Sequence, residues 1–422
     1  MIALASSCAI ALYLLPVALV LAWQRARGRP AAALAFYVPA ALAADLLGIL
    51  ALCLFLRVEQ AAVVSRVLWI TAAPLSWWRA KQARAASTER VTLWVPLAAA
   101  VAAALLSGWY SHFYSIWDRG WHIGLVTSLR GQRIPFQNVY HYEGYLRYHF
   151  SGDVIAATLQ SLSLNVINSD FALSLAHDVM FALTGFSLAL LTGGALPGER
   201  ARLHPALRVL ATLLGVMALL LSGPVTLMRD GLESTLAGHS VMSYFTMSFR
   251  PHVSLSGLLF VGVGACLLSR LRASSSLDTP SEEPNALPAL LLIVAALGIA
   301  DETSTGLMGL TLGVTWLIWP RILDERRWVG ALVLLGLALA FLGTNYLFGA
   351  SISPGMPVSR ARWVEWRAPG YTLLPEALRT GAGLKALLFD LMPVPLTLVG
   401  LMLMRHRIPA RVRGALIGFL VV

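Results

Sequence analysis

The chain has 422 residues, of which 58% are hydrophobic and 13% charged, and its formal net charge is +11. Because soluble globular domains carry about 25% charged residues, this composition excludes a water-soluble enzyme or binding domain. The basic residues gather at the ends of apolar runs and form no basic face interleaved with aromatic residues, so nucleic acid is not expected as a partner.

Long apolar runs determine the predicted fold class. A helix of about 20 apolar residues crosses the hydrocarbon core with its backbone groups hydrogen-bonded internally. We therefore predict an all-α fold, a polytopic transmembrane helical bundle with about 12 spans. The expected spans cover residues 2–23, 31–56, 61–78, 91–110, 171–193, 207–227, 253–271, 287–302, 305–320, 329–348, 386–404 and 414 onward.

The predicted spans fall into two parts. Residues 1–90 form a three-span N-terminal extension, and residues 91–422 form the main transmembrane domain. Within the main domain, residues 274–285 (SSSLDTPSEEPN) are expected to be a polar cytoplasmic linker. The chain stops at Val422, about nine residues into a new apolar run that is too short to cross a membrane, so we expect the C-terminus to be truncated.

Basic residues indicate the orientation in the membrane, because cytoplasmic connections are enriched in Lys and Arg. Most of the Lys and Arg residues lie in six short connections, near residues 25–29, 79–90, 200–208, 270–272, 321–327 and 405–413. With these connections in the cytoplasm, we expect a protein of the bacterial inner (plasma) membrane with its N-terminus outside. The segment 152–167 then cannot cross, and we predict a helix that lies on or dips into the interface within one large external loop, 111–170.

The first half of this external loop contains a predicted helix with candidate catalytic residues. Asp118 and His122 are four residues apart, so they share one face of a helix. Trp121, Leu125 and Leu129 form an apolar stripe beside that face. The helix is therefore expected to lie along the membrane surface, with Asp118 directed inward.

The second half of the loop concentrates aromatic and polar side chains. The aromatic rings suit stacking on the apolar faces of a sugar, and the polar groups suit its hydroxyls. The cluster consists of His141, Tyr142, Glu143, Tyr145, Arg147, Tyr148, His149 and Asp153. Arginine holds phosphate oxygens by charge-assisted hydrogen bonds, and the loop offers four arginines for this role: Arg119, Arg130, Arg133 and Arg147.

Two further external segments carry candidate substrate-binding residues. Asp301 and Glu302 lie at the expected tip of a short hairpin, and carboxylates this close to an apolar span are functional candidates. Arg250 and His252 stand at the outer end of the span 253–271, where they can contact an anionic head group.

The same residues also fit structural roles, and the sequence leaves both interpretations open. Tyrosine and tryptophan gather at membrane interfaces for solvation alone. Asp118 is a suitable N-cap for the loop helix, a lone His122 is as often structural as functional, and Asp301 with Glu302 also fits a hairpin tip in water.

No metal site is predicted. Cys8, Cys53 and Cys266 lie within apolar spans and lack the spacing of metal ligands or of a disulfide framework. Asp118 and His122 supply only two ligands, which is too few to assert a metal. The sequence indicates no particular cofactor.

The external loop resembles that of the GT-C superfamily, membrane glycosyltransferases that use polyprenyl-phosphate-linked sugars. The residues that carry the resemblance, over about 60 positions of the loop, are Asp118 after a span, His122, Leu129, Gly131, Pro135 and the stretch Gly144-Tyr145-Leu146-Arg147-Tyr148-His149. The resemblance implies that Asp118 is the catalytic acidic residue, acting as general base or orienting the acceptor. Members of the superfamily usually have one span before this loop, whereas four are predicted here.

The predicted function follows from this resemblance and from the polar external loop. We expect transfer of a sugar from a polyprenyl-phosphate donor to an acceptor on the extracytoplasmic face, with membrane lipid as a further partner. One alternative is a transporter or flippase, which requires polar groups at mid-membrane depth. Asp45 and Asp178 are the clearest of these in the predicted spans. Another alternative is a non-enzymatic assembly protein.

Overall fold

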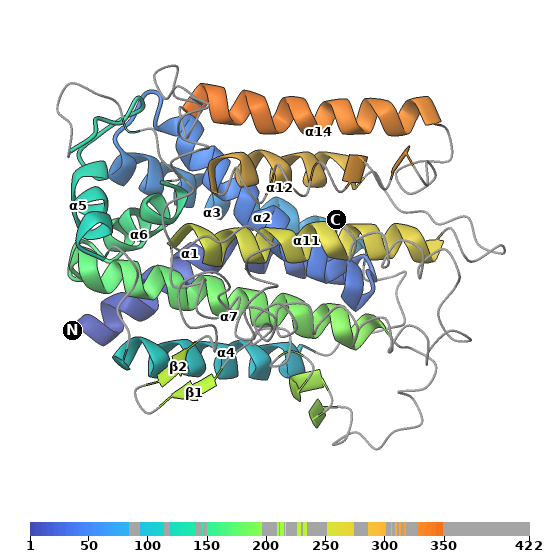
Figure 1. Cartoon of the computed structure of the whole chain (residues 1–422), viewed down its shortest axis with the longest axis horizontal. Coiled ribbons are helices and arrows are strands. Elements are labelled where there is room, and N and C mark those ends of the chain that lie inside the picture. The colour runs from blue at the N-terminus through green and yellow to red at the C-terminus, as the bar shows by residue number, and fades with distance from the viewer. Residues whose placement is uncertain are drawn as a thin grey trace, which may run out of the picture.

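The computed structural model describes most of the first half of the chain and several helices of the second half. The described residues are 1–83, 93–113, 119–139, 146, 150–195, 209–210, 212–214, 216, 226–228, 231–233, 251–273, 286–300, 305, 309, 312–313, 316–317 and 327–348. The long helices are α1 (Ile2–Ala26), α2 (Ala31–Leu52), α3 (Val58–Ala83), α4 (Trp94–Phe113), α7 (Ser169–Ala195), α11 (Pro251–Ala273), α12 (Leu287–Ala300) and α14 (Arg327–Phe348). They run roughly side by side as a helical bundle (Figure 1).

Apolar composition makes this bundle a membrane domain. In the described part of the chain, four helices are long and apolar enough to cross a bilayer: Ile2–Ala26, Ala33–Leu52, Ser169–Thr192 and Trp328–Phe348. Three shorter apolar helices, Trp94–Trp109, Val253–Leu267 and Leu287–Ala300, lie among them. The predictions of an α-helical fold and of an integral membrane protein are therefore confirmed.

The helix bounds agree with the predicted spans wherever whole spans are described, with small shifts at the ends. Helix α2, for example, ends at Leu52 rather than at residue 56. One local prediction is wrong, because the expected span 207–227 does not stay helical to its end. Instead, β1 (Thr226–Met228) pairs antiparallel with β2 (Gly231–Glu233), which places Thr226 opposite Glu233. The predicted spans 386–404 and 414 onward, and the linker 274–285, lie outside the described residues.

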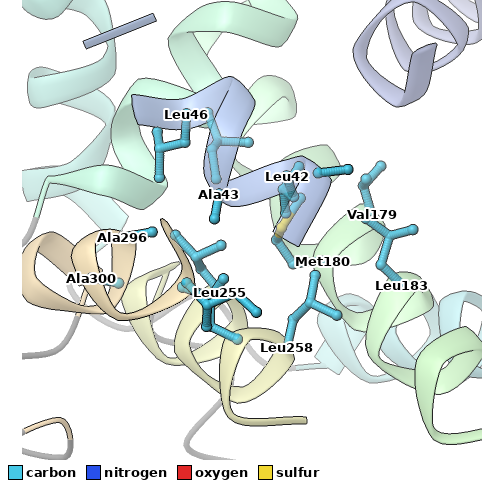
Figure 2. Close-up of a cluster of buried hydrophobic side chains, with 14 of the residues drawn as sticks. Leu42, Ala43, Leu46, Val179, Met180, Leu183, Leu255, Leu258, Ala296 and Ala300 are labelled. Atoms are coloured by element: carbon cyan, nitrogen blue, oxygen red, sulfur yellow. The ribbon is translucent and has the colours of Figure 1, made fainter. Parts of the chain in front are cut away.

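Helix α2 is the centre of the bundle and contacts α1, α3, α7, α11 and α12. The contacts are made by small and branched apolar side chains, which suit close helix packing in a membrane. Figure 2 shows the cluster where α2, α7, α11 and α12 meet. Its labelled members are Leu42, Ala43, Leu46, Val179, Met180, Leu183, Leu255, Leu258, Ala296 and Ala300.

Helices α4 and α7 approach closely at Gly185. A Cβ atom on this glycine would lie 2.9 Å from Cβ of Ala103 and 3.1 Å from the carbonyl oxygen of Ala99. Only a residue without a side chain allows this separation of the two helices, as in other small-residue contacts between membrane helices.

Gly185→Ala is therefore expected to destabilise the protein by about 1–3 kcal/mol through overpacking. Unfolding of the purified protein in mixed detergent micelles measures this change. Gly48→Ala is the matched control, because a Cβ atom there meets nothing within 4 Å. Equal stability of the two variants would contradict the close approach of α4 and α7.

Two short helices, α5 (Arg119–Leu129) and α6 (Ser151–Leu162), lie at the end of the bundle that also holds the N-terminus (Figure 1). The segment after α5 is tied to the connection between α2 and α3. The amide of Val58 donates to the carbonyl of Gln132 at 3.0 Å, and the amide of Ile134 donates to the carbonyl of Cys53 at 2.8 Å. These bonds place α5 at the same end as that connection.

Helix α6 corrects part of the prediction for residues 152–167. All of its 12 residues are buried, and it contacts α1, α3, α5, α7, α11 and α12. A helix of this length spans about 18 Å, which is too short to cross the hydrocarbon core. The helix thus does not cross, as predicted, but it is inserted among other helices and does not lie on the surface. Its polar side chains explain the difference, because several of them bond within the protein: Gln160, for example, donates to the carbonyl of Ile167 at 3.2 Å.

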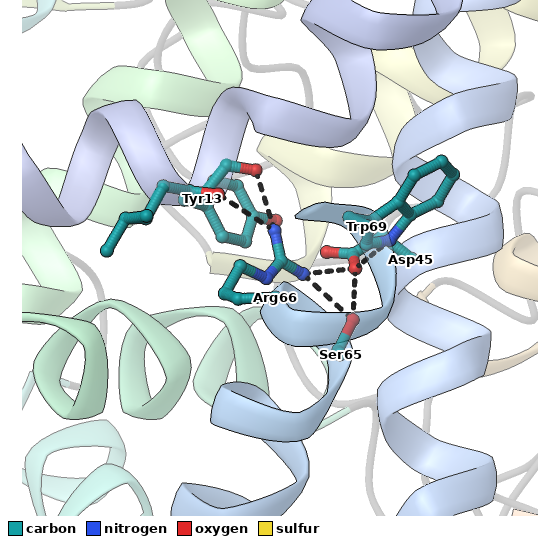
Figure 3. A network of polar contacts seen from close by, with 6 residues as sticks. Tyr13, Asp45, Ser65, Arg66 and Trp69 are labelled. Carbon is teal, nitrogen blue, oxygen red and sulfur yellow. Dashed lines mark hydrogen bonds and ion pairs between the residues drawn. The ribbon is translucent and has the colours of Figure 1, made fainter. Parts of the chain in front are cut away.

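A buried polar network joins the first three helices (Figure 3). Arg66 of α3 forms an ion pair with Asp45 of α2, and their side chains are 4% and 1% exposed. The carboxylate of Asp45 also accepts hydrogen bonds from Ser65 Oγ at 2.8 Å and from Trp69 Nε1 at 3.0 Å. The structure therefore neutralises the carboxylate that stood out in the predicted span 31–56.

Candidate functional site

Two of the predicted site residues are described together with their side chains, Arg119 and His122, and both belong to α5. His252 is the second residue of α11. The other predicted site residues lie outside the described part of the chain: Asp118, Tyr142, Arg147, Tyr148, His149, Arg250, Asp301 and Glu302. The roles predicted for them stay predictions.

The His122 side chain of α5 points into the protein interior. His122 shares the buried face of this helix with Leu125, Val126 and Leu129, which have the spacing of one helical stripe. Its Nδ1 lies 2.8 Å from Oδ1 of Asp153 in α6, and the two side chains are 2% and 0% exposed. A carboxylate bonded to one imidazole nitrogen determines the tautomer and orientation of the ring.

The sequence contained Asp153 but did not single it out. It was one member of the aromatic and polar cluster, 31 residues from His122. The available signal was the one charged residue of the helix, in its first turn. Only the packing of α6 against α5 shows that the two residues form a pair.

Asp153→Val is expected to lower the free energy of unfolding by about 1–3 kcal/mol, because the buried Nδ1 of His122 loses its acceptor. Thermal unfolding in detergent measures the change. Ser151→Ala is the control, since Ser151 is also fully buried in α6 but does not take part in this pair. If Asp153→Val and Ser151→Ala lose the same free energy of unfolding, the pair of His122 and Asp153 does not contribute to stability as proposed.

Arg119, the first residue of α5, forms an ion pair with Asp170 in the first turn of α7. Nε of the guanidinium donates to Oδ1 of the carboxylate. This hydrogen bond raises the pKa of Arg119, desolvation opposes the rise, and the charge of Asp170 adds to it. The side chains are 32% and 41% exposed, so this pair, unlike that of His122, lies at the surface.

The start of α7 is tied to both short helices. The side chain of Asn168 accepts a hydrogen bond from the amide of Phe171 at 2.8 Å, as an N-cap residue does. Ser169 Oγ lies 2.8 Å from Thr127 Oγ1 of α5 and donates to Gln160 Oε1 of α6 at 3.2 Å. These bonds hold α5, α6 and the first turn of α7 in one arrangement.

A second polar cluster lies between α4 and α7. Ser107 Oγ donates to Oδ1 of Asp178 and lies 2.9 Å from Nδ1 of His177. The His177 ring stacks on Phe181 with a centroid separation of 6.0 Å. Asp178, the second carboxylate noted within the predicted spans, therefore has a hydrogen-bonding partner on the neighbouring helix.

No group of three or more His, Cys, Asp or Glu side chains is placed to hold a metal ion within the described residues. Comparison with protein-family models, with curated proteins and with solved structures finds no match. The function is therefore inferred from the arrangement of the residues.

Proposed function

We propose that the chain is an integral membrane glycosyltransferase that moves a sugar from a polyprenyl-phosphate donor to an acceptor on the extracytoplasmic face. The insertion of α5 and α6 into one end of the bundle supports this proposal. This insertion places Arg119, a partly exposed cation, beside the start of α7. Arg119 directly follows Asp118 in the sequence. A lipid-linked phosphate reaches such an end from the bilayer without leaving its membrane.

In the proposed orientation, the N-terminus and the helices α5 and α6 lie at the extracytoplasmic end of the bundle, in a bacterial inner membrane. The whole chain has about 12 spans. Exposed aromatic residues fit helices that cross a membrane in either direction, because tryptophan and tyrosine are enriched at both interfaces. Trp94 and Trp109 of α4 are separated by about 22 Å along the helix, and Trp328 and Tyr346 of α14 by about 27 Å. Both separations approach the thickness of the hydrocarbon core.

In the proposed reaction, Asp118 accepts the proton of an acceptor hydroxyl as this oxygen attacks C1 of the sugar. The bond from C1 to the phosphate oxygen breaks, and the lipid phosphate leaves with the electron pair. The result is inversion at C1. Arg119 stabilises the charge on the leaving phosphate, and the buried pair of His122 and Asp153 holds α5 in place.

The remaining predicted residues are assigned to substrate binding on the same face. Aromatic side chains among them would stack on the sugar, and the charged ones would bond its hydroxyls and the phosphate. They are Tyr142, Arg147, Tyr148, His149, Arg250, His252, Asp301 and Glu302.

Transfer of radiolabelled sugar from a panel of polyprenyl-phosphate-linked hexoses and pentoses, in membranes that contain the protein, tests this function. We expect consumption of at least one donor above the level of matched membranes that lack the protein. If no donor is consumed while the protein is inserted and folded, the proposed function is wrong.

A transporter or flippase is the second candidate, and two polar clusters within the apolar helices favour it. These are the pair of Asp45 and Arg66 and the group of Ser107, His177 and Asp178. Asp45 and Arg66 neutralise each other in a closed, buried contact, which suits a structural role better than a transport site. Movement of a fluorescent polyprenyl phosphate across liposomes containing the protein, without any sugar transfer, would favour transport.

A further inference from the structure

The guanidinium of Arg119 is only partly used by its ion pair. An arginine has five N–H donors in a planar fork, and Asp170 takes the hydrogen of Nε. Neither Nη1 nor Nη2 of Arg119 is hydrogen-bonded to any residue in the described part of the chain. The outer edge of the fork, which suits the geometry of a phosphate, therefore remains available at the surface.

The partner of this arginine, Asp170, lies on a turn whose neighbouring residues are tied to the two short helices. It lies in the first turn of α7, next to Ser169, whose side chain contacts both Thr127 of α5 and Gln160 of α6. The preceding residue, Asn168, caps the same turn. The backbone of Asp170 is therefore fixed relative to α5 and α6, and the Nε hydrogen bond ties the Arg119 guanidinium to this turn.

We propose that Asp170 is a positioning residue, which orients the Arg119 guanidinium so that its Nη1 and Nη2 edge binds the phosphate group of a membrane lipid. This inference rests on the proposed function in naming polyprenyl phosphate as that lipid. A cation that is already oriented loses little conformational entropy when it binds, and supporting hydrogen bonds maintain such an orientation. Like any arginine, Arg119 stays charged over the whole accessible pH range.

Binding of polyprenyl phosphate to the full-length protein in nanodiscs of neutral phosphatidylcholine tests the proposal. Asp170→Asn is expected to weaken binding about five- to tenfold, although it removes a negative charge near the phosphate. Arg119→Lys keeps the charge but loses the fork, and we expect a similar loss. Since both variants remove the same oriented fork, the double variant should lose no more than Arg119→Lys alone.

Ser128→Ala is the control, because Ser128 lies on the same helix and, among the described residues, its side chain bonds only to the carbonyl of Leu125. Its binding should equal that of the wild type. A dissociation constant for Asp170→Asn that is unchanged or lower would overturn the proposal, since removal of a mere counter-charge would tighten binding. Additive losses in the double variant would also overturn it.

Two competitors identify the source of the phosphate. Excess phosphatidylglycerol or inorganic phosphate should not displace polyprenyl phosphate, and displacement by either would overturn the assignment to this lipid. The proposal and the proposed function can fail separately. Binding that depends on Asp170, in a protein that transfers no sugar, would support the phosphate site and refute the glycosyltransferase.

Discussion

Arg66→Met is expected to lower the free energy of unfolding by about 3–5 kcal/mol, because it leaves the carboxylate of Asp45 buried without its counter-ion. The two side chains are 4% and 1% exposed, so water cannot replace the lost partner. Unfolding in mixed detergent micelles, monitored by circular dichroism, measures the change. The α1–α2–α3 part of the bundle should be affected first.

A second contact of Arg66 adds to this effect. Helix α1 contains Pro16, which has no N–H, so the carbonyl of Leu12 four residues earlier lacks its usual helical donor. Nη1 of Arg66 donates to the carbonyls of Leu12 and Tyr13, each at 3.1 Å. Arg66 thereby satisfies a backbone acceptor within the apolar region, where an unsatisfied group is costly.

The double variant Asp45→Leu/Arg66→Met separates the cost of an unpaired charge from the cost of the other contacts that Arg66 makes. Oδ2 of Asp45 and Nε of Arg66 have no hydrogen-bond partner among the described residues, so the pair is imperfectly satisfied. Replacing both partners with apolar side chains should therefore recover part of the stability lost in Arg66→Met. The recovery should be incomplete, because the carbonyls of Leu12 and Tyr13 and the donors of Ser65 and Trp69 still lack their partners. If the double variant is less stable than the single one, the burial of a lone charge does not explain the loss.

Asp118→Asn is expected to reduce sugar transfer by about 10²- to 10⁴-fold, the range for loss of a general base. The asparagine keeps the size of the side chain but cannot accept the acceptor proton. Sugar transfer from a polyprenyl-phosphate donor, measured at equal amounts of inserted protein, shows the effect. Binding of polyprenyl phosphate should be almost unchanged, because Arg119 rather than Asp118 is assigned to the phosphate.

Two controls make this result specific. Ser128→Ala, on the helix that follows Asp118, should retain full activity. Asp118→Glu keeps a carboxylate and should recover part of the activity. Unchanged transfer by Asp118→Asn would leave Asp118 as a cap or solvated loop residue, and transport or a scaffolding role would then explain the polar loop better.

The α-helical fold and most helix bounds could be predicted from the sequence, because they depend on local properties. Uncharged apolar runs of sufficient length form helices in a bilayer whatever their neighbours are. Accordingly, α1, α7, α11 and α14 begin and end within a few residues of the predicted spans. The non-spanning character of residues 152–167 also followed from the charge pattern, since a crossing there would have reversed the orientation of every later connection.

The partners of the polar side chains depended on the tertiary structure. Asp45 pairs with Arg66, 21 residues away, and His122 pairs with Asp153, 31 residues away. Such pairs arise only where two helices pack in one particular register and rotation, which apolar runs of similar composition do not specify. For the same reason, the sequence predicted that α6 lies on or dips into the interface, but only the structure shows that it is buried among six other described helices, where several of its polar side chains find partners inside the protein.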